Sequence, residues 1–84
     1  MRVVFADRAW DDLTCWVTHD RKPAKRIIRL IDDIKRHPFA GLGKPEPLKH
    51  DLAGFWSRRI TDEHRLVYAV EGDQLLVAQA RYHY

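Results

Sequence analysis

The sequence predicts an α+β fold, in which two helices pack on one face of a mostly antiparallel, twisted sheet. Apolar residues recur at helical spacing in two segments of the first half of the chain, residues 7–18 and 20–37. Three strand-like runs separated by short polar turns follow in the second half. Because 84 residues supply one hydrophobic core, we expect a single domain over residues 1–84 with the element order β-α-α-β-β-β.

The first half begins with a strand and continues as a helical hairpin. Residues 2–5 are typical of a short strand, and Asp7 is expected to cap a helix that runs to about Thr18. Asp20 begins the second helix, which ends at His37 because a proline follows. The apolar stripes expected to face the core are Trp10, Leu13 and Val17 in the first helix and Ile27, Leu30, Ile31 and Ile34 in the second.

A long loop separates the helices from the remaining strands. Residues 38–54 hold three of the four prolines and three of the four glycines, so helix and strand are disfavoured across most of this span. A loop of this length in so small a domain is often functional. Strand-like runs then cover residues 55–60, 65–70 and 75–81, joined by short hairpin turns.

Side-chain alternation along these runs predicts a cationic face on the sheet. In the last run we expect the set that contains Leu76 and Ala78 to face the helices, because it is the more apolar set. A single β-bulge would invert part of this assignment. The charged or imidazole side chains expected on the face away from the helices are Arg59, Arg65, Arg81 and His83.

The positive charge is concentrated in the second helical segment. The whole chain carries +3, whereas residues 21–36 hold seven basic and two acidic side chains, a net of +5. Such a cluster favours binding to nucleic acid or to an acidic partner, and a solvated helix face is the alternative interpretation. The residues of this cluster that we expect to bind such a partner are Lys25, Arg26 and Arg29.

Composition excludes several classes of protein. The single cysteine, Cys15, excludes a disulfide framework and a cysteine-rich zinc site and fits a reducing compartment. No apolar run approaches the roughly 18 residues of a membrane span, so we expect a cytoplasmic protein without membrane contact. No cluster of carboxylates and histidines has metal-ligand spacing, and the acidic pairs at 11–12 and 32–33 are expected to be solvated. We therefore expect neither a metal nor a cofactor.

The loop and the C-terminal end carry residue types that can cleave RNA without a nucleophile from the protein. The 2′-hydroxyl of RNA attacks the neighbouring phosphate, so the protein supplies only a base, a cation and an acid. Glu46, Arg65 and His83 have the chemical types for these three tasks.

The second half of the chain contains four distinctive motifs, which occupy residues 44–50 (KPEPLKH), 54–60 (GFWSRRI), 63–68 (EHRLVY) and 81–84 (RYHY). With these motifs, essentially the whole chain resembles the YoeB (Txe) toxin family of the RelE/ParE toxin–antitoxin superfamily. The resemblance implies a RelE-like fold, similar to that of microbial ribonucleases. It also implies a metal-independent, ribosome-dependent endoribonuclease that cleaves mRNA in the ribosomal A site and inhibits translation.

The resemblance further implies roles for individual residues. Glu46 corresponds to the general base, Arg65 to the arginine that stabilises the phosphate, and His83 to the general acid. The residues implied to complete the RNA site are Tyr84, which shapes the substrate site, and Lys49 and Arg59, which lie near the scissile phosphate.

The partners implied by the resemblance are a YefM-type antitoxin, the ribosome with its mRNA, and a second copy of the chain. Operator DNA is bound only through the toxin–antitoxin complex. The alternative is a ParE-like toxin, which shares the fold but binds and inhibits a DNA topoisomerase without catalysis. Because that activity needs no acid–base set, the presence of Glu46 and His83 disfavours it.

Overall fold

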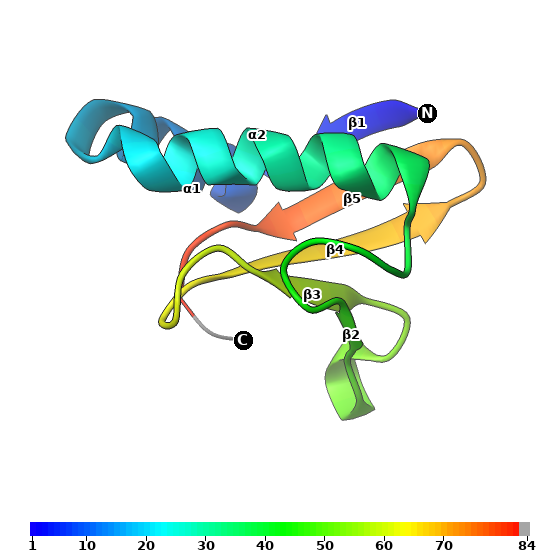
Figure 1. Cartoon of the computed structure of the whole chain (residues 1–84). Coiled ribbons are helices and arrows are strands. Elements are labelled where there is room, and N and C mark those ends of the chain that lie inside the picture. The colour runs from blue at the N-terminus through cyan, green and yellow to red at the C-terminus, as the bar shows by residue number, and fades with distance from the viewer. Residues whose placement is uncertain (83–84) are drawn as a thin grey trace.

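Five strands form one sheet, and both helices contribute to a core on the same face of it, as the computed structural model shows (Figure 1). The structure describes residues 1–82. The expected α+β class is confirmed, with a two-residue strand and a 3-10 turn added inside the long loop. The elements are β1 (Arg2–Phe5), α1 (Asp7–His19), α2 (Arg21–Arg36), β2 (Glu46–Pro47), η1 (His50–Leu52), β3 (Trp56–Arg59), β4 (Arg65–Glu71) and β5 (Gln74–Gln79).

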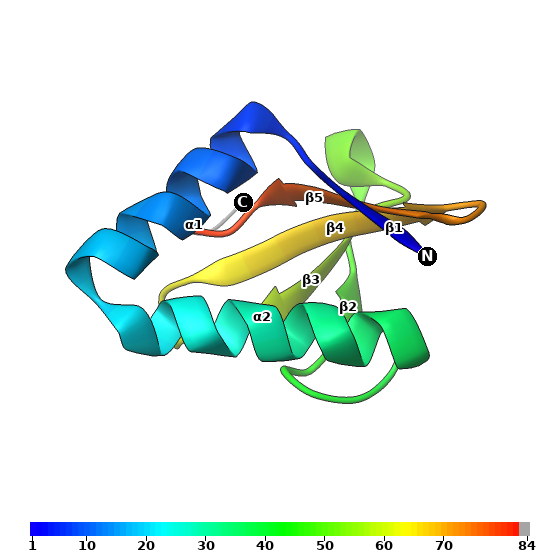
Figure 2. The ribbon, with the colours of Figure 1, turned by 90° about the horizontal axis from the view of Figure 1, so that it is seen from above.

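The sheet has the strand order β1-β5-β4-β3-β2. β1 pairs in parallel with β5, and the other three pairings are antiparallel, so the sheet is mostly antiparallel as expected. Seen from above, the helices form a V (Figure 2). Asp20 lies at its apex, where it ends α1 and caps α2 by accepting a hydrogen bond from the backbone N–H of Lys22.

The apolar stripe expected on α2 is confirmed as the centre of the core. Ile27, Leu30 and Ile34 are fully buried, and Ile31 is 9% exposed. Full burial of such a side chain contributes about 1.5–3 kcal/mol, so this stripe is sufficient to dock the helix on the sheet. The strand side chains in the same cluster are Leu66, Tyr68, Leu75 and Val77.

The stripe expected on α1 is wrong at two of its three positions. Trp10 and Val17 are 55% and 48% exposed, and only Leu13 packs against the core. Ala9 and Trp16 pack in or against the core instead. The helix directs the Trp16 indole toward the end of β5. There its Nε1–H donates to a backbone carbonyl at 2.9 Å, a bond that apolar periodicity does not encode.

The start of α1 also differs from expectation. Asp7 is the first residue of the helix, and Ala6 occupies the cap position without a side-chain hydrogen bond. A carboxylate in the first turn still favours the helix, because it faces the positive end of the helix dipole. Within residues 1–82, neither helix has the length and apolar character needed to cross a membrane.

The side chains of β5 lie on other faces of the sheet than expected, and a β-bulge accounts for the difference. The register shifts between Val67, which is opposite Gln79, and Tyr68, which is opposite Val77. Val77 belongs to the core cluster beneath the helices, so the set that contains Leu76 lies on the other face. The expectation that Leu76 faces the helices is therefore wrong for the part of β5 that precedes the bulge.

Candidate active site on the open face of the sheet

The face of the sheet that points away from the helices, called the open face below, carries three of the side chains singled out in the sequence. Residues directly opposite each other on paired strands share a face. Glu46 of β2 is opposite Ser57 of β3, and Ser57 is opposite Val67 of β4. Val67 alternates with core residues of β4, so this row lies on the open face. Arg59, two residues beyond Ser57, shares that face and is directly opposite Arg65.

Strand geometry places these charged groups near one another. Directly opposite residues such as Arg59 and Arg65 have Cβ atoms about 4.5–5.5 Å apart, and diagonal neighbours such as Glu46 and Arg59 are about 7–8 Å apart. A carboxylate and two guanidinium groups therefore border the same stretch of the open face. This combination can bind a phosphate and accept a proton beside it.

The turn between β3 and β4 fixes the guanidinium of Arg65. Its Nη1 donates to the carbonyl oxygens of Thr61, Asp62 and His64 at 2.7, 3.0 and 3.1 Å. Within residues 1–82 its Nε and Nη2 make no hydrogen bond. The backbone N–H of Arg65 donates to the carbonyl oxygen of Tyr82 at 3.1 Å, which places the last described residue beside it.

Glu46 lies in the edge strand β2, and its side chain is exposed. It borders an open pocket of about 350 Å³ formed by β2 and the segment that follows. Lys49 lines the same pocket, so the structure brings these two candidate site residues together. The remaining lining residues are Pro47, Leu48, His50 and Leu52.

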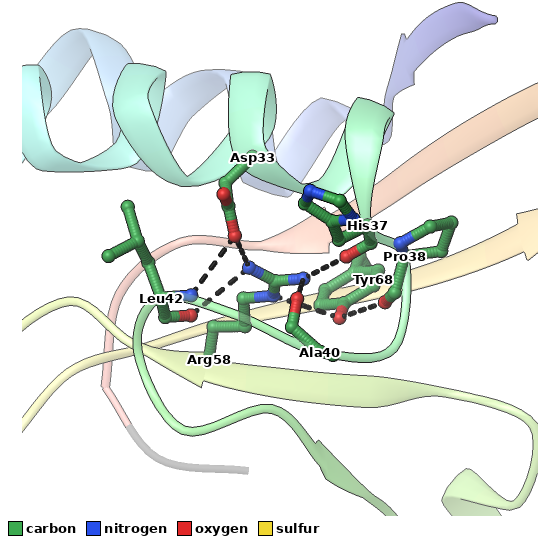
Figure 3. A network of polar contacts seen from close by, with 7 residues as sticks. All are labelled: Asp33, His37, Pro38, Ala40, Leu42, Arg58 and Tyr68. Atoms are coloured by element: carbon green, nitrogen blue, oxygen red, sulfur yellow. Dashed lines mark hydrogen bonds and ion pairs between the residues drawn. The ribbon is translucent and has the colours of Figure 1, made fainter.

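Arg58, directly before Arg59, is completely buried and organises the loop that leads to Glu46 (Figure 3). The sequence alone predicts no role for this residue. The available signal was its alternation with Arg59, which turns it toward the helices with Trp56 and Ile60. Its hydrogen bonds are from Nη1 to Asp33 Oδ2 (2.6 Å) and the Leu42 oxygen (3.1 Å), from Nη2 to the oxygens of His37 (2.5 Å) and Ala40 (2.9 Å), and from Nε to Tyr68 Oη (3.1 Å).

The Arg58 network also shifts the pKa values of its partners. Hydrogen bonds from the backbone N–H of Leu42 and from Arg58 hold the pKa of Asp33 below its ordinary value of 3.8. Burial raises the pKa of Tyr68 above its ordinary value of 10, and the hydrogen bond from Arg58 opposes that shift. Tyr68 therefore keeps its proton, which it donates to the carbonyl oxygen of Pro38 at 2.7 Å.

The network holds residues 37–42 against the core and so sets the path of the loop into β2. Gly41 has a φ of +115°, and a Cβ there would collide with the carboxylate of Asp33. Immediately afterwards, the carbonyl oxygen of Gly43 accepts a hydrogen bond from the backbone N–H of Arg59 at 2.7 Å. Glu46 thus begins its strand three residues after a segment that is bonded to both the helix layer and the sheet.

The expectation that the acidic pairs of both helices are solvated is wrong for one member of each. Asp33 is 19% exposed and ion-paired with Arg58. Asp12 is 9% exposed, and its Oδ2 accepts a hydrogen bond from the backbone N–H of Ala80 at 2.9 Å. The other member of each pair is exposed as expected.

The remaining candidate residues at the C-terminal end lie away from the open face or beyond the described chain. Arg81 turns toward α1, with its guanidinium carbon 5.6 Å from the ring centroid of Trp16, so the expectation that it joins the cationic face is wrong. His83 and Tyr84 lie outside the described residues.

The basic residues Lys25, Arg26 and Arg29 belong to α2, and this helix lies on the helical side of the sheet (Figure 1). Lys25 and Arg29 are exposed, while Arg26 is half-buried beside Ile60 in a hollow of about 310 Å³. Among residues 1–82 none of these three cations has an ion-pair partner. In the same part of the chain, no three His, Cys, Asp or Glu side chains gather as metal ligands.

Comparison with known proteins shows strong similarity along the whole chain. Residues 5–84 match the family model of YoeB-like toxins of bacterial type II toxin–antitoxin systems. Toxin YoeB of Streptomyces coelicolor is 61% identical over 84 residues, and toxin YoeB of Escherichia coli K12 is 57% identical over 84 residues. Both alignments cover 100% of each chain.

Solved structures share the fold. The YoeB/ParE toxin from Agrobacterium tumefaciens superposes with a TM-score of 0.97 at 53% identity, covering 100% of both chains. The YoeB dimer from Staphylococcus aureus gives 0.94 at 40% identity, and the YoeB–YefM complex from the same organism gives 0.92 at 39% identity. Each covers 100% of this chain and 98% of the other.

Proposed function

The chain belongs to the family of YoeB-like toxins of bacterial type II toxin–antitoxin systems, and from that premise we propose that it is an endoribonuclease that cleaves mRNA in the ribosomal A site. One observation carries the proposal: Glu46, Arg59 and Arg65 share the open face. The backbone of Arg65 also binds Tyr82, the residue that precedes His83. A carboxylate and two guanidinium groups therefore share one face, and the last described residue lies beside one of the guanidinium groups.

The reaction needs no nucleophile from the protein. Glu46 removes the proton from the 2′-hydroxyl, whose oxygen attacks the adjacent phosphorus. Arg65 stabilises the charge that develops on the phosphate oxygens, using the donors that its turn leaves available. His83 protonates the 5′-oxygen as its bond to phosphorus breaks, which leaves a 2′,3′-cyclic phosphate. Because the RNA supplies the nucleophile and side chains move both protons, we propose a metal-independent reaction.

Other residues bind the RNA rather than move protons. Lys49 and Arg59 hold the backbone on either side of Glu46, and Tyr84 positions the substrate. The exposed cations Lys25 and Arg29, with Arg26, lie on the opposite side of the sheet, so we assign them to ribosomal RNA. In this scheme one side of the molecule faces the message and the other faces the ribosome.

The proposed cellular partner is a YefM-type antitoxin, which is supported by the YoeB–YefM complex from Staphylococcus aureus. A homodimer is supported by the YoeB dimer from the same organism. Operator DNA would be bound through the toxin–antitoxin complex. The site of action is the bacterial cytoplasm, where ribosomes translate.

The proposal is tested with ribosomes programmed with a defined message. Glu46→Gln and His83→Gln each remove one proton-transfer group, and we expect each to lower the cleavage rate by about 100-fold or more. Glu71→Gln is the matched control, because Glu71 is an exposed carboxylate at the end of β4. Full activity in both site variants would overturn the acid–base assignment. Inhibition of a topoisomerase in a supercoiling assay, without RNA cleavage, would favour the ParE-like alternative.

A further inference from the structure

Three side chains outside the candidate active site bind the backbone of the chain just before its end, and we call them the C-terminal clamp: Asp12, Trp16 and His64. Asp12 Oδ2 accepts from the N–H of Ala80 at 2.9 Å, and Trp16 Nε1 donates to the carbonyl oxygen of Ala80 at 2.9 Å. His64 Nδ1 accepts from the N–H of Tyr82 at 2.8 Å. Both polar groups of one residue and the amide of another are therefore held by side chains that are remote in sequence.

The hydrogen bond of His64 defines the role of its Nδ1 atom. A backbone N–H can only donate, so Nδ1 acts as the acceptor in this hydrogen bond. The ring meets Trp16 edge-on, with centroids 4.8 Å apart, and lies 5.5 Å from the ring of Tyr82. His64 thus joins α1 to the chain end by one polar and two aromatic contacts.

The backbone of Tyr82 is held in a conformation that it would not adopt freely. Its φ is +64°, in the left-handed region that non-glycine residues rarely occupy. Such conformations persist where the surrounding contacts determine them, and they concentrate at functional sites. Tyr82 has these contacts on both sides: its N–H binds His64, and its carbonyl oxygen accepts from the N–H of Arg65.

We propose that His64 is a positioning residue for the reaction: it holds the backbone of Tyr82, the residue that precedes His83 in the sequence. This inference rests on the proposed function, because it concerns the residue assigned as general acid. His64 and Arg65 are adjacent, so one dipeptide aligns the chain end and places the phosphate-stabilising guanidinium. Misplacement of a proton donor by about 1 Å can cost about 100-fold in rate, so a single hydrogen bond at this point matters for catalysis.

Two substitutions of His64 separate its polar role from its packing role. His64→Phe keeps a ring against Trp16 but removes the acceptor, whereas His64→Asn removes the ring but offers Oδ1 close to the position of Nδ1. We expect His64→Phe to lower kcat for mRNA cleavage on ribosomes by about 10- to 100-fold with KM changed by less than about two-fold. His64→Asn should restore kcat to within about five-fold of the unsubstituted chain. His19→Asn, at the exposed end of α1, is the matched control.

Amide hydrogen exchange at Tyr82 provides a readout that does not depend on activity. Loss of the acceptor in His64→Phe should speed exchange of this amide by about ten-fold, while core amides of β4 stay protected. Unchanged kcat in His64→Phe, or equal loss of kcat in both variants, would overturn the positioning role. If the unsubstituted chain cleaves no mRNA, the proposed function fails by itself, and exchange at Tyr82 still decides whether His64 holds the chain end.

Discussion

Replacement of Arg58 by methionine removes the buried guanidinium while keeping a side chain of similar length. The change removes the Arg58 hydrogen bonds from the carboxylate of Asp33, the hydroxyl of Tyr68 and three loop carbonyl groups. The carboxylate of Asp33 keeps only the hydrogen bond from the backbone N–H of Leu42. Removal of one partner of a buried ion pair costs about 3–5 kcal/mol. Because Asp33 is 19% exposed and can be hydrated, we predict the lower end, about 3 kcal/mol of unfolding free energy. In a domain of this size that corresponds to a fall in Tm of roughly 12–24 °C.

Urea unfolding followed by circular dichroism measures this loss. Arg59→Met is the matched control, because Arg59 is the next residue, is exposed, and should change stability by less than about 0.5 kcal/mol. A loss below about 1 kcal/mol in Arg58→Met, or equal losses in both variants, would refute the reasoning that the network holds the loop.

The pKa of Asp33 is lowered in the folded chain, so its contribution to stability is complete above about pH 4 and declines as the pH falls below that value. The stability difference between the unsubstituted chain and Asp33→Asn should therefore shrink on acidification in urea titrations, and a constant difference would contradict the assignment. Gly41→Ala should cost about 1–3 kcal/mol in the same assay, because its φ is +115° and its Cβ meets Asp33. Neutralising Lys25, Arg26 and Arg29 together should weaken ribosome binding and flatten its salt dependence, lowering the slope of log K against log salt by about 2–3. An unchanged slope would contradict the assignment of α2 to the RNA-binding surface.

The architecture could be predicted from the sequence where one periodic signal dominates. The stripe on α2 has uniform apolar residues at helical spacing, and it forms the centre of the core. The alternation of side chains along β3 correctly predicts that Arg59 lies on the open face with Arg65. Glu46 could be singled out only as a carboxylate in the long loop with the chemical type of a general base. In each case local pattern and tertiary packing agree.

The rest depends on polar contacts between distant segments, which periodicity does not report. α1 exposes Trp10 because the face bearing Asp12 and Trp16 is bonded to the chain end. Asp33 is paired rather than solvated because Arg58 reaches it from β3, twenty-five residues later. The bulge in β5 changes the face on which its side chains lie, and no glycine or proline in the strand indicates it in the sequence. The contacts that the sequence does not predict are therefore those that fix the loop and the chain end around the open face.

Attack by the message's own 2′-hydroxyl on this face is the step on which the proposed function depends. It is tested by a message whose A-site codon is built from 2′-deoxynucleotides, loaded on ribosomes and compared with the all-ribonucleotide message. We predict that the ribonucleotide codon is cleaved to a product ending in a 2′,3′-cyclic phosphate and that the deoxynucleotide codon stays intact. Cleavage of both codons at the same rate would contradict attack by the 2′-hydroxyl and with it the roles assigned to Glu46 and His83.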